Sequence, residues 1–205
     1  FHLASVSKPF TAAAILMLEE RGRLSVHDPL ARFIPDYPNG KAITLHHLLA
    51  HYSGIPNVNN FPDYDEKSKF PQSLEQVIRM FRDKPAEFAP GARYSYSNSN
   101  YNLLAHIIEK VSGQSYGEFL ARNIFQPLGM ADTGHDGDPR VLLKNRAAGH
   151  MPAALNEVAN APYLDWSIKT GNGSLYSTVE DLYKWDRALY TERILKKATL
   201  ELDLG

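Results

Sequence analysis

Ser5 and Lys8 stand three residues apart at the start of the apolar, alanine-rich run 10–18. On a helix this spacing places two side chains on one face, about one turn apart. A serine hydroxyl becomes a useful nucleophile when a neighbouring base takes its proton, and a lysine can do so when desolvation lowers its pKa. The pair therefore predicts an activated nucleophile at a helix start, where unpaired backbone N–H groups favour developing negative charge.

The same spacing also fits a helix-capping serine followed by a solvated lysine, and two common residues meet it by chance about once in a chain of this length. A second cluster, Tyr96-Ser97-Asn98, follows a loop at 88–93 and precedes a helical pattern over 101–111. In that position a phenol and an amide are directed into one cleft. The alternative is that Tyr96 packs in the core and Asn98 caps the helix.

Five blocks occur in order along the chain: SVSK at 5–8, LLAHYSGIP at 48–56, YSNSNYNLL at 96–104, PLGM at 127–130 and LYSTVEDL at 175–182. Together they resemble the serine β-lactamase and penicillin-binding protein superfamily. The most similar branch holds the class C β-lactamases, the D-alanyl-D-alanine carboxypeptidases and related esterases. The resemblance covers almost the whole sequence.

The resemblance implies a serine hydrolase that forms a covalent acyl-enzyme with an amide, ester or β-lactam, on a small-molecule or peptide substrate. Ser5 would be the nucleophile and Lys8 its first proton acceptor or electrostatic activator. Tyr96 would be the partner base and later acid, and Asn98 would bind the substrate amide and the lysine. Which of Lys8 and Tyr96 takes the first proton stays open. The alternative function is a non-catalytic scaffold or sensor, or an inactive truncated fragment.

The resemblance also implies a β-lactamase/transpeptidase-like fold, which is α+β in the full family. Because the family carries strands before the nucleophile helix and after the block at 175–182, we expect residues 1–205 to be an interior fragment of one such domain. It would comprise the nucleophile helix 5–21 and a helical region over about 28–205. We expect a mainly α chain that lacks most of the central antiparallel sheet and one donor of the oxyanion hole.

An apolar face of helix 5–21 would then be uncovered and could drive self-association. The residues that suggest such a face are Phe10, Ala13, Ala14, Ile15, Leu16, Met17 and Leu18.

A third family motif, Lys/His-x-Gly, finds a match at Lys169-Thr170-Gly171. In the family that motif follows the block matched here at 175–182, whereas this match precedes it. We therefore predict that Lys169 does not belong to the third motif.

Local signals predict several helices and their caps. We expect four helices with N-terminal caps: 45–51 capped by Thr44, 74–82 by Ser73, 116–125 by Ser115 and 178–190 by Ser177. The last two caps have a Glu three residues later, as in a capping box. Gly113 is expected to end the helix that starts at Asn98 or Ser99. Segments 37–43, 57–71 and 132–165 are rich in loop-forming residues. We expect the first and third to border the site.

Composition excludes several other functions. A formal net charge of −1 without a basic run gives no reason to expect nucleic acid as a partner, and the longest apolar run is too short to span a bilayer. The chain has no cysteine. His47 and His51 have a spacing that suits zinc, but they lack a glutamate between them and a third ligand, so we predict no metal and no cofactor. The resemblance favours a periplasmic or extracellular location, with any signal peptide upstream of Phe1.

Overall fold

Helices are the main regular secondary structure of this computed structural model, which describes residues 1–154 and 157–201. The helices are α1 (Lys8–Glu20), α2 (Leu45–Leu49), α3 (Tyr64–Lys67), α4 (Leu74–Phe81), α5 (Asn98–Ser112), α6 (Tyr116–Leu120), α7 (Gln126–Leu128), α8 (Val179–Leu189) and α9 (Lys197–Leu200). Short 3₁₀ turns lie at η1 (Ala4–Ser7), η2 (Leu30–Arg32), η3 (Val58–Asn60) and η5 (Trp166–Lys169), and the π-helical segment η4 (Ala121–Phe125) joins α6 to α7. None of the described helices combines the length and apolar character that a membrane crossing requires.

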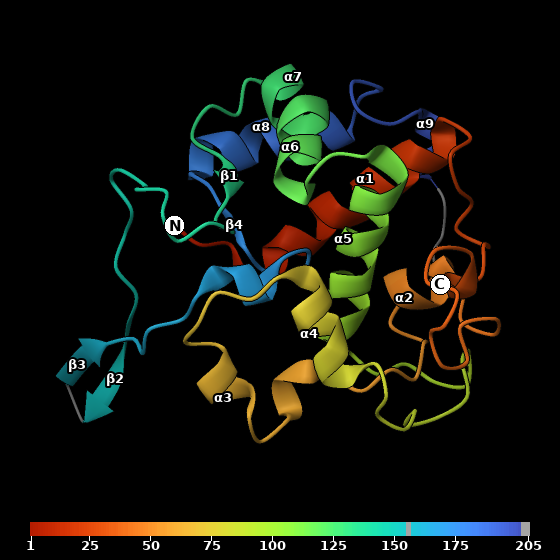
Figure 1. Cartoon of the computed structure of the whole chain (residues 1–205). Coiled ribbons are helices and arrows are strands. Elements are labelled where there is room, and N and C mark those ends of the chain that lie inside the picture. The colour runs from red at the N-terminus through yellow and green to blue at the C-terminus, as the bar shows by residue number, and fades with distance from the viewer. Residues whose placement is uncertain (155–156, 202–205) are drawn as a thin grey trace.

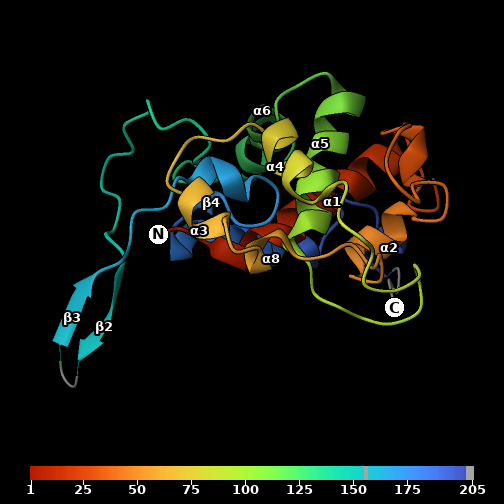
Figure 2. The same ribbon diagram turned by 60° about the horizontal axis from the view of Figure 1, so that its bottom comes forward.

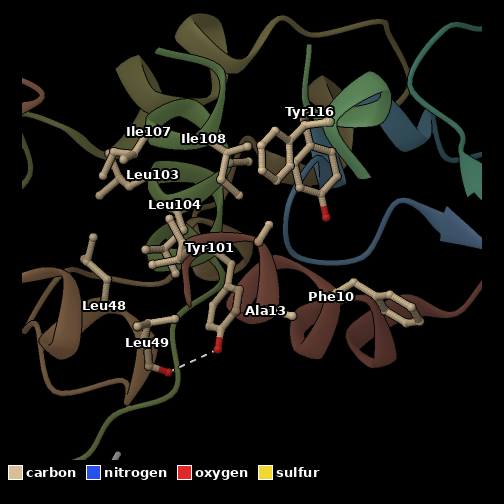
Figure 3. Packing of buried hydrophobic residues seen from close by; sticks show 14 of the residues in the cluster. Phe10, Ala13, Leu48, Leu49, Tyr101, Leu103, Leu104, Ile107, Ile108 and Tyr116 are labelled. Carbon is tan, nitrogen blue, oxygen red and sulfur yellow. Dashed lines mark hydrogen bonds between the residues drawn. The ribbon is translucent and has the colours of Figure 1, made fainter. Parts of the chain in front are cut away.

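The core is built around α5, which crosses α1 in the middle of the molecule (Figure 1). Figure 3 shows the apolar side chains of α5 filling this crossing, and Leu103, Leu104, Ile107 and Ile108 have no exposed surface. Near the first turn of α5, the Tyr101 hydroxyl donates a hydrogen bond of 3.1 Å to the backbone oxygen of Leu49. The crossing brings the beginnings of α1 and α5 together, and these carry the serine–lysine pair and the tyrosine–asparagine pair.

Two small antiparallel sheets complete the fold. β1 (Gly134–His135) pairs with β4 (Leu175–Tyr176), and residues 1–3 lie beside β4 through a hydrogen bond of 2.8 Å from the Leu3 N–H to the Leu175 carbonyl. β2 (His150–Ala154) and β3 (Glu157–Asn160) form a hairpin that projects from the body in both views (Figures 1 and 2). The prediction of a mainly helical chain with little sheet is confirmed for the described residues.

The strands within 132–165 differ from the predicted loop. Every described residue of β2 and β3 is exposed. A hairpin without a buried face needs no alternation of apolar and polar residues, and that alternation is the main sequence signal of a strand.

The caps follow local sequence closely. Thr44, Ser73 and Ser115 each accept a hydrogen bond from the backbone N–H three residues later, as predicted. The predicted cap at Ser177 is wrong by one residue, because Thr178 accepts from the Asp181 N–H. The Ser177 hydroxyl lies instead 2.7 Å from the Thr133 hydroxyl, which takes it away from the helix start.

The apolar residues of α1 that suggested an uncovered face are buried, so the prediction of such a face on this helix is wrong. The seven side chains that suggested it are between 0% and 8% exposed. The ring of Phe10 stacks on Trp185 of α8 at 4.1 Å, and α5 and α6 pack against the rest of the helix. The covering therefore comes from distant parts of the same chain. Self-association stays a prediction, but this face of α1 no longer supports it. That residues 1–205 are an interior fragment of one domain also stays a prediction.

Gly171, which joins η5 to β4, lies in the left-handed region with a φ of +86°. A β-carbon there would lie 2.2 Å from the Tyr101 backbone oxygen and 2.6 Å from the Ala105 β-carbon. We expect Gly171→Ala to lower the free energy of unfolding by at least about 2 kcal/mol, since both strain and overpacking act. Gly22→Ala is the matched control, because Gly22 has a φ of +66° and a β-carbon there would have nothing within 4 Å. Urea denaturation that finds equal losses would contradict this expectation.

Candidate active site

The structure brings Ser5, Lys8 and Tyr96 together. The Ser5 hydroxyl oxygen is 2.7 Å from the Tyr96 hydroxyl, and the Lys8 ammonium donates to the same Ser5 oxygen at 3.1 Å. Ser5 lies in the 3₁₀ turn η1 rather than in the predicted α-helix, and Lys8 is the first residue of α1. Because Ser5 is exposed while Lys8 is buried, a ligand can reach the serine and water is kept from the lysine.

Within the described residues, Lys8 is held by uncharged acceptors. Its ammonium donates to the Asn98 side-chain oxygen and to the Asn172 backbone oxygen, both at 2.9 Å, besides Ser5. The side chain is 6% exposed, and burial lowers the pKa of Lys8 from its ordinary value to about 8. A lysine with this pKa has a neutral fraction near pH 7 and can accept a proton.

Asn98 is oriented by the second loop-rich segment, at 57–71, which the sequence did not place at the site. Its backbone N–H donates to the Asn57 side-chain oxygen at 3.1 Å, and its side-chain nitrogen donates to the Asn59 side-chain oxygen at 3.1 Å. These contacts turn the Asn98 oxygen toward Lys8. The cluster of three asparagines at 57, 59 and 60 was the available sequence signal, because asparagine both turns the chain and accepts hydrogen bonds.

Tyr96 is supported by His51, which the sequence analysis placed in the block at 48–56 and weighed as a metal ligand but did not connect to Tyr96. The two ring centroids are 4.6 Å apart, and His51 Nδ1 accepts a hydrogen bond of 3.2 Å from the Ser97 backbone N–H. Burial, and next the positive charge of Lys8, lower the pKa of His51 to about 4. His51 is therefore neutral at pH 7, as an acceptor must be.

The Asn172 carbonyl reaches Lys8 because a buried amide pair fixes its loop. The Asn172 side-chain nitrogen donates to the Asn102 side-chain oxygen at 3.1 Å, and the Asn102 nitrogen donates to the Thr170 carbonyl at 2.9 Å. The positive φ of Gly171 lets this loop lie close to α5. The Lys-Thr-Gly match is thus part of the loop that supports Lys8, and its Lys169 side chain points to Tyr64 of α3.

The pKa of Lys8 predicts the pH dependence of any acylation at Ser5. Below pH 8 Lys8 is mostly protonated and cannot accept the serine proton, so we expect the acylation rate to rise about tenfold per pH unit there and to level off above pH 8. Rates of adduct formation with a fluorophosphonate between pH 6 and 10, measured by intact mass, check this. A rate that does not vary with pH over that range would exclude Lys8 as the base.

A serine at a helix start, contacted by a desolvated lysine and a tyrosine, defines a site of the serine acyl-transfer type. The chain belongs to the Beta-lactamase family, which it matches over residues 1–204. The resemblance to serine β-lactamases and penicillin-binding proteins is thereby confirmed.

Individual proteins agree with this family. The chain is 36% identical to penicillin-binding protein 4* of Bacillus subtilis over 216 residues, covering 98% of this chain and 47% of that protein. Among solved structures it is similar to a D-stereospecific amidohydrolase from Streptomyces, with a TM-score of 0.86, 28% identity and coverage of 98% and 63% of the two chains. It is also similar to a D-amino acid amidase from Ochrobactrum anthropi, with a TM-score of 0.87 and 29% identity. The match covers 98% of this chain and 58% of that chain. The chain spans about half the length of the curated relatives it matches.

Proposed function

We propose that this chain carries the nucleophile and proton-transfer groups of a serine hydrolase that forms a covalent ester on Ser5. One observation carries the proposal: the Ser5 oxygen is within hydrogen-bond distance of both the Tyr96 hydroxyl and the Lys8 ammonium. The two groups can share one proton relay, which takes the proton from Ser5 and returns it to the leaving group.

The reaction then proceeds in two steps, acylation of Ser5 and hydrolysis of the resulting ester. The Ser5 oxygen attacks the carbonyl carbon while its proton passes to neutral Lys8 or through Tyr96. The bond to the leaving group breaks, and the leaving nitrogen or oxygen takes the proton back from Tyr96 or Lys8. Water then attacks the ester carbonyl and loses a proton to the same groups. The bond to the Ser5 oxygen breaks, that oxygen takes the proton back, and the acid and the free Ser5 hydroxyl are released. The backbone N–H of Ser5 is one donor to the oxyanion that forms in each step.

Asn98 binds substrate in this proposal. Its oxygen already accepts from Lys8, while its nitrogen donates to Asn59, so a substrate amide that replaces Asn59 can bond to it. Two proteins of similar structure are described as a D-stereospecific amidohydrolase and a D-amino acid amidase. We infer that the substrates are amides, β-lactams or activated esters of D-configured acyl donors.

Covalent labelling tests the proposal. We expect the intact protein to gain the mass of one adduct with a fluorophosphonate and of one with benzylpenicillin, and the urea-unfolded protein to gain none. Turnover of p-nitrophenyl esters, nitrocefin and D-alanyl-D-alanine peptides would then rank the substrate classes. A folded protein that reacts with neither reagent would favour the non-catalytic scaffold instead.

A further inference from the structure

Lys169 is a half-buried lysine that the proposed reaction does not use. It is the last residue of η5, and its ammonium lies over the ring of Tyr64 at 4.9 Å from the centroid. Among the residues that the structure describes, no oxygen accepts a hydrogen bond from this ammonium and no carboxylate forms an ion pair with it. A cation that is partly removed from water and has only an aromatic face for a partner is poorly compensated.

The surroundings of Lys169 favour an anion. Burial, and next the charge of Lys8, lower the pKa of Lys169 to about 8, while the Asp65 carboxylate opposes this in part. Two ammonium groups therefore act on the same region, and the acceptors that Lys8 contacts among residues 1–154 and 157–201 are all uncharged. An added negative charge would be attracted by both lysines.

A second donor lies beside the lysine. The Tyr64 side chain is 5% exposed, and its buried hydroxyl, although close to the Asn59 side chain, makes no hydrogen bond of ordinary geometry within the described residues. Tyr64 and Lys169 thus present an O–H and an ammonium group without an acceptor. A carboxylate supplies acceptors for both.

Lys169 is linked to the proposed site by two short connections. Its backbone oxygen accepts from the Asn172 N–H at 2.9 Å, and the Asn172 carbonyl accepts from Lys8. On the other side Tyr64 lies near Asn59, which accepts from Asn98. Asn98 therefore stands between Ser5 and Lys169 in this chain of contacts.

We propose that Lys169 binds a carboxylate on the acyl part of the substrate, so that the preferred donors are acidic acyl groups. The proposal rests on the proposed function, in which Tyr96 serves the leaving group and Asn98 binds an amide of the acyl part. An acyl chain that passes Asn98 then continues toward Lys169. Tyr64 assists as the second donor.

A binding experiment without catalysis tests this subsite. In a Ser5→Ala protein, which cannot be acylated at this position, N-succinyl-D-phenylalaninamide and N-acetyl-D-phenylalaninamide are titrated at pH 7 and followed by NMR. The two ligands differ by the CH2–COO⁻ group that the succinyl compound carries in addition. We expect the succinyl compound to bind about five- to tenfold more tightly, as one partly desolvated ion pair provides.

Variants of Lys169 assign the preference. Adding Lys169→Met should make the two dissociation constants equal, while Lys169→Arg should retain most of the difference. Lys69→Met is the matched control, because Lys69 is an exposed lysine paired with Glu66, and it should change nothing. Thermal unfolding of each variant shows that the fold is retained.

A measurement without any Lys169 variant gives a second readout. With ¹³C-labelled lysine, the pKa of the Lys169 side chain should rise when the succinyl compound binds and stay constant with the acetyl compound. Equal binding of the two ligands, binding of neither, or a preference that survives Lys169→Met would overturn the proposal. Failure of covalent labelling together with a Lys169-dependent preference would instead reject the hydrolase and retain the carboxylate site.

Discussion

Ser5→Ala should abolish covalent labelling of the folded protein by a fluorophosphonate, lowering the rate by at least about a thousandfold. Ser5 is the serine whose oxygen contacts both the Lys8 ammonium and the Tyr96 hydroxyl. Without its oxygen no bond to the phosphorus can form at this position. Intact mass gives the extent of labelling, and peptide mapping of the wild-type adduct should place the modification on Ser5.

The control for this result is Ser95→Ala, which removes a hydroxyl close in sequence to Tyr96. The Ser95 hydroxyl contacts Glu87 at 3.4 Å and no group of the proposed site. We expect labelling of this variant at the wild-type rate, and circular dichroism should show the same helix content in all three proteins. Labelling of Ser5→Ala at an undiminished rate would remove Ser5 from the mechanism.

Lys8→Met and Tyr96→Phe should each lower the acylation rate by about 10²- to 10⁴-fold, and the double variant should lose hardly more than the worse single one. Both groups bond to the same Ser5 oxygen, and the Lys8 ammonium also lies 4.8 Å from the Tyr96 ring. Removing either one therefore interrupts the same proton transfer. A double-mutant cycle on the acylation rate measures this coupling.

Tyr94→Phe provides the matched control for the cycle. Tyr94 is an exposed tyrosine two residues earlier, with its ring 6.0 Å from His51, and its hydroxyl makes no hydrogen bond to Ser5 or Lys8 in the described structure. Combined with Lys8→Met it should give only the Lys8→Met loss. If the Lys8 and Tyr96 losses multiply, the two groups act in separate steps and the shared transfer is wrong.

The sequence indicated which side chains lie together better than it indicated the groups that support them. Ser5 and Lys8 are three residues apart, and Tyr96 and Asn98 two apart, so their spacing and the order of the blocks were visible in the sequence. The Asn172 carbonyl, by contrast, is a backbone atom, and any residue type could supply it. His51 supports Tyr96 from a distant part of the chain through ring packing, which leaves no local pattern.

The same division holds for the fold. Caps at Thr44, Ser73 and Ser115 were predictable because the donor and acceptor lie within one helical turn. The covering of α1 was not, because the Trp185 ring that stacks on Phe10 comes from the other end of the chain. Amphipathic patterns indicate that a face is buried, but they do not identify the partner.

The burial of Lys8 also couples folding to proton release. In the unfolded chain a lysine titrates near 10.5, whereas the folded pKa is about 8, so between these pH values the unfolded state holds more protons than the folded one. Unfolding then takes up protons, and the contribution of Lys8 to stability rises with pH across this window and is least favourable below pH 8. Near neutral pH the native state thus contains a poorly solvated ammonium group. This group lowers the free energy of unfolding, which an apolar side chain in its place would not do. The same burial therefore lowers the pKa of Lys8, which allows it to accept a proton, and lowers the stability of the folded protein.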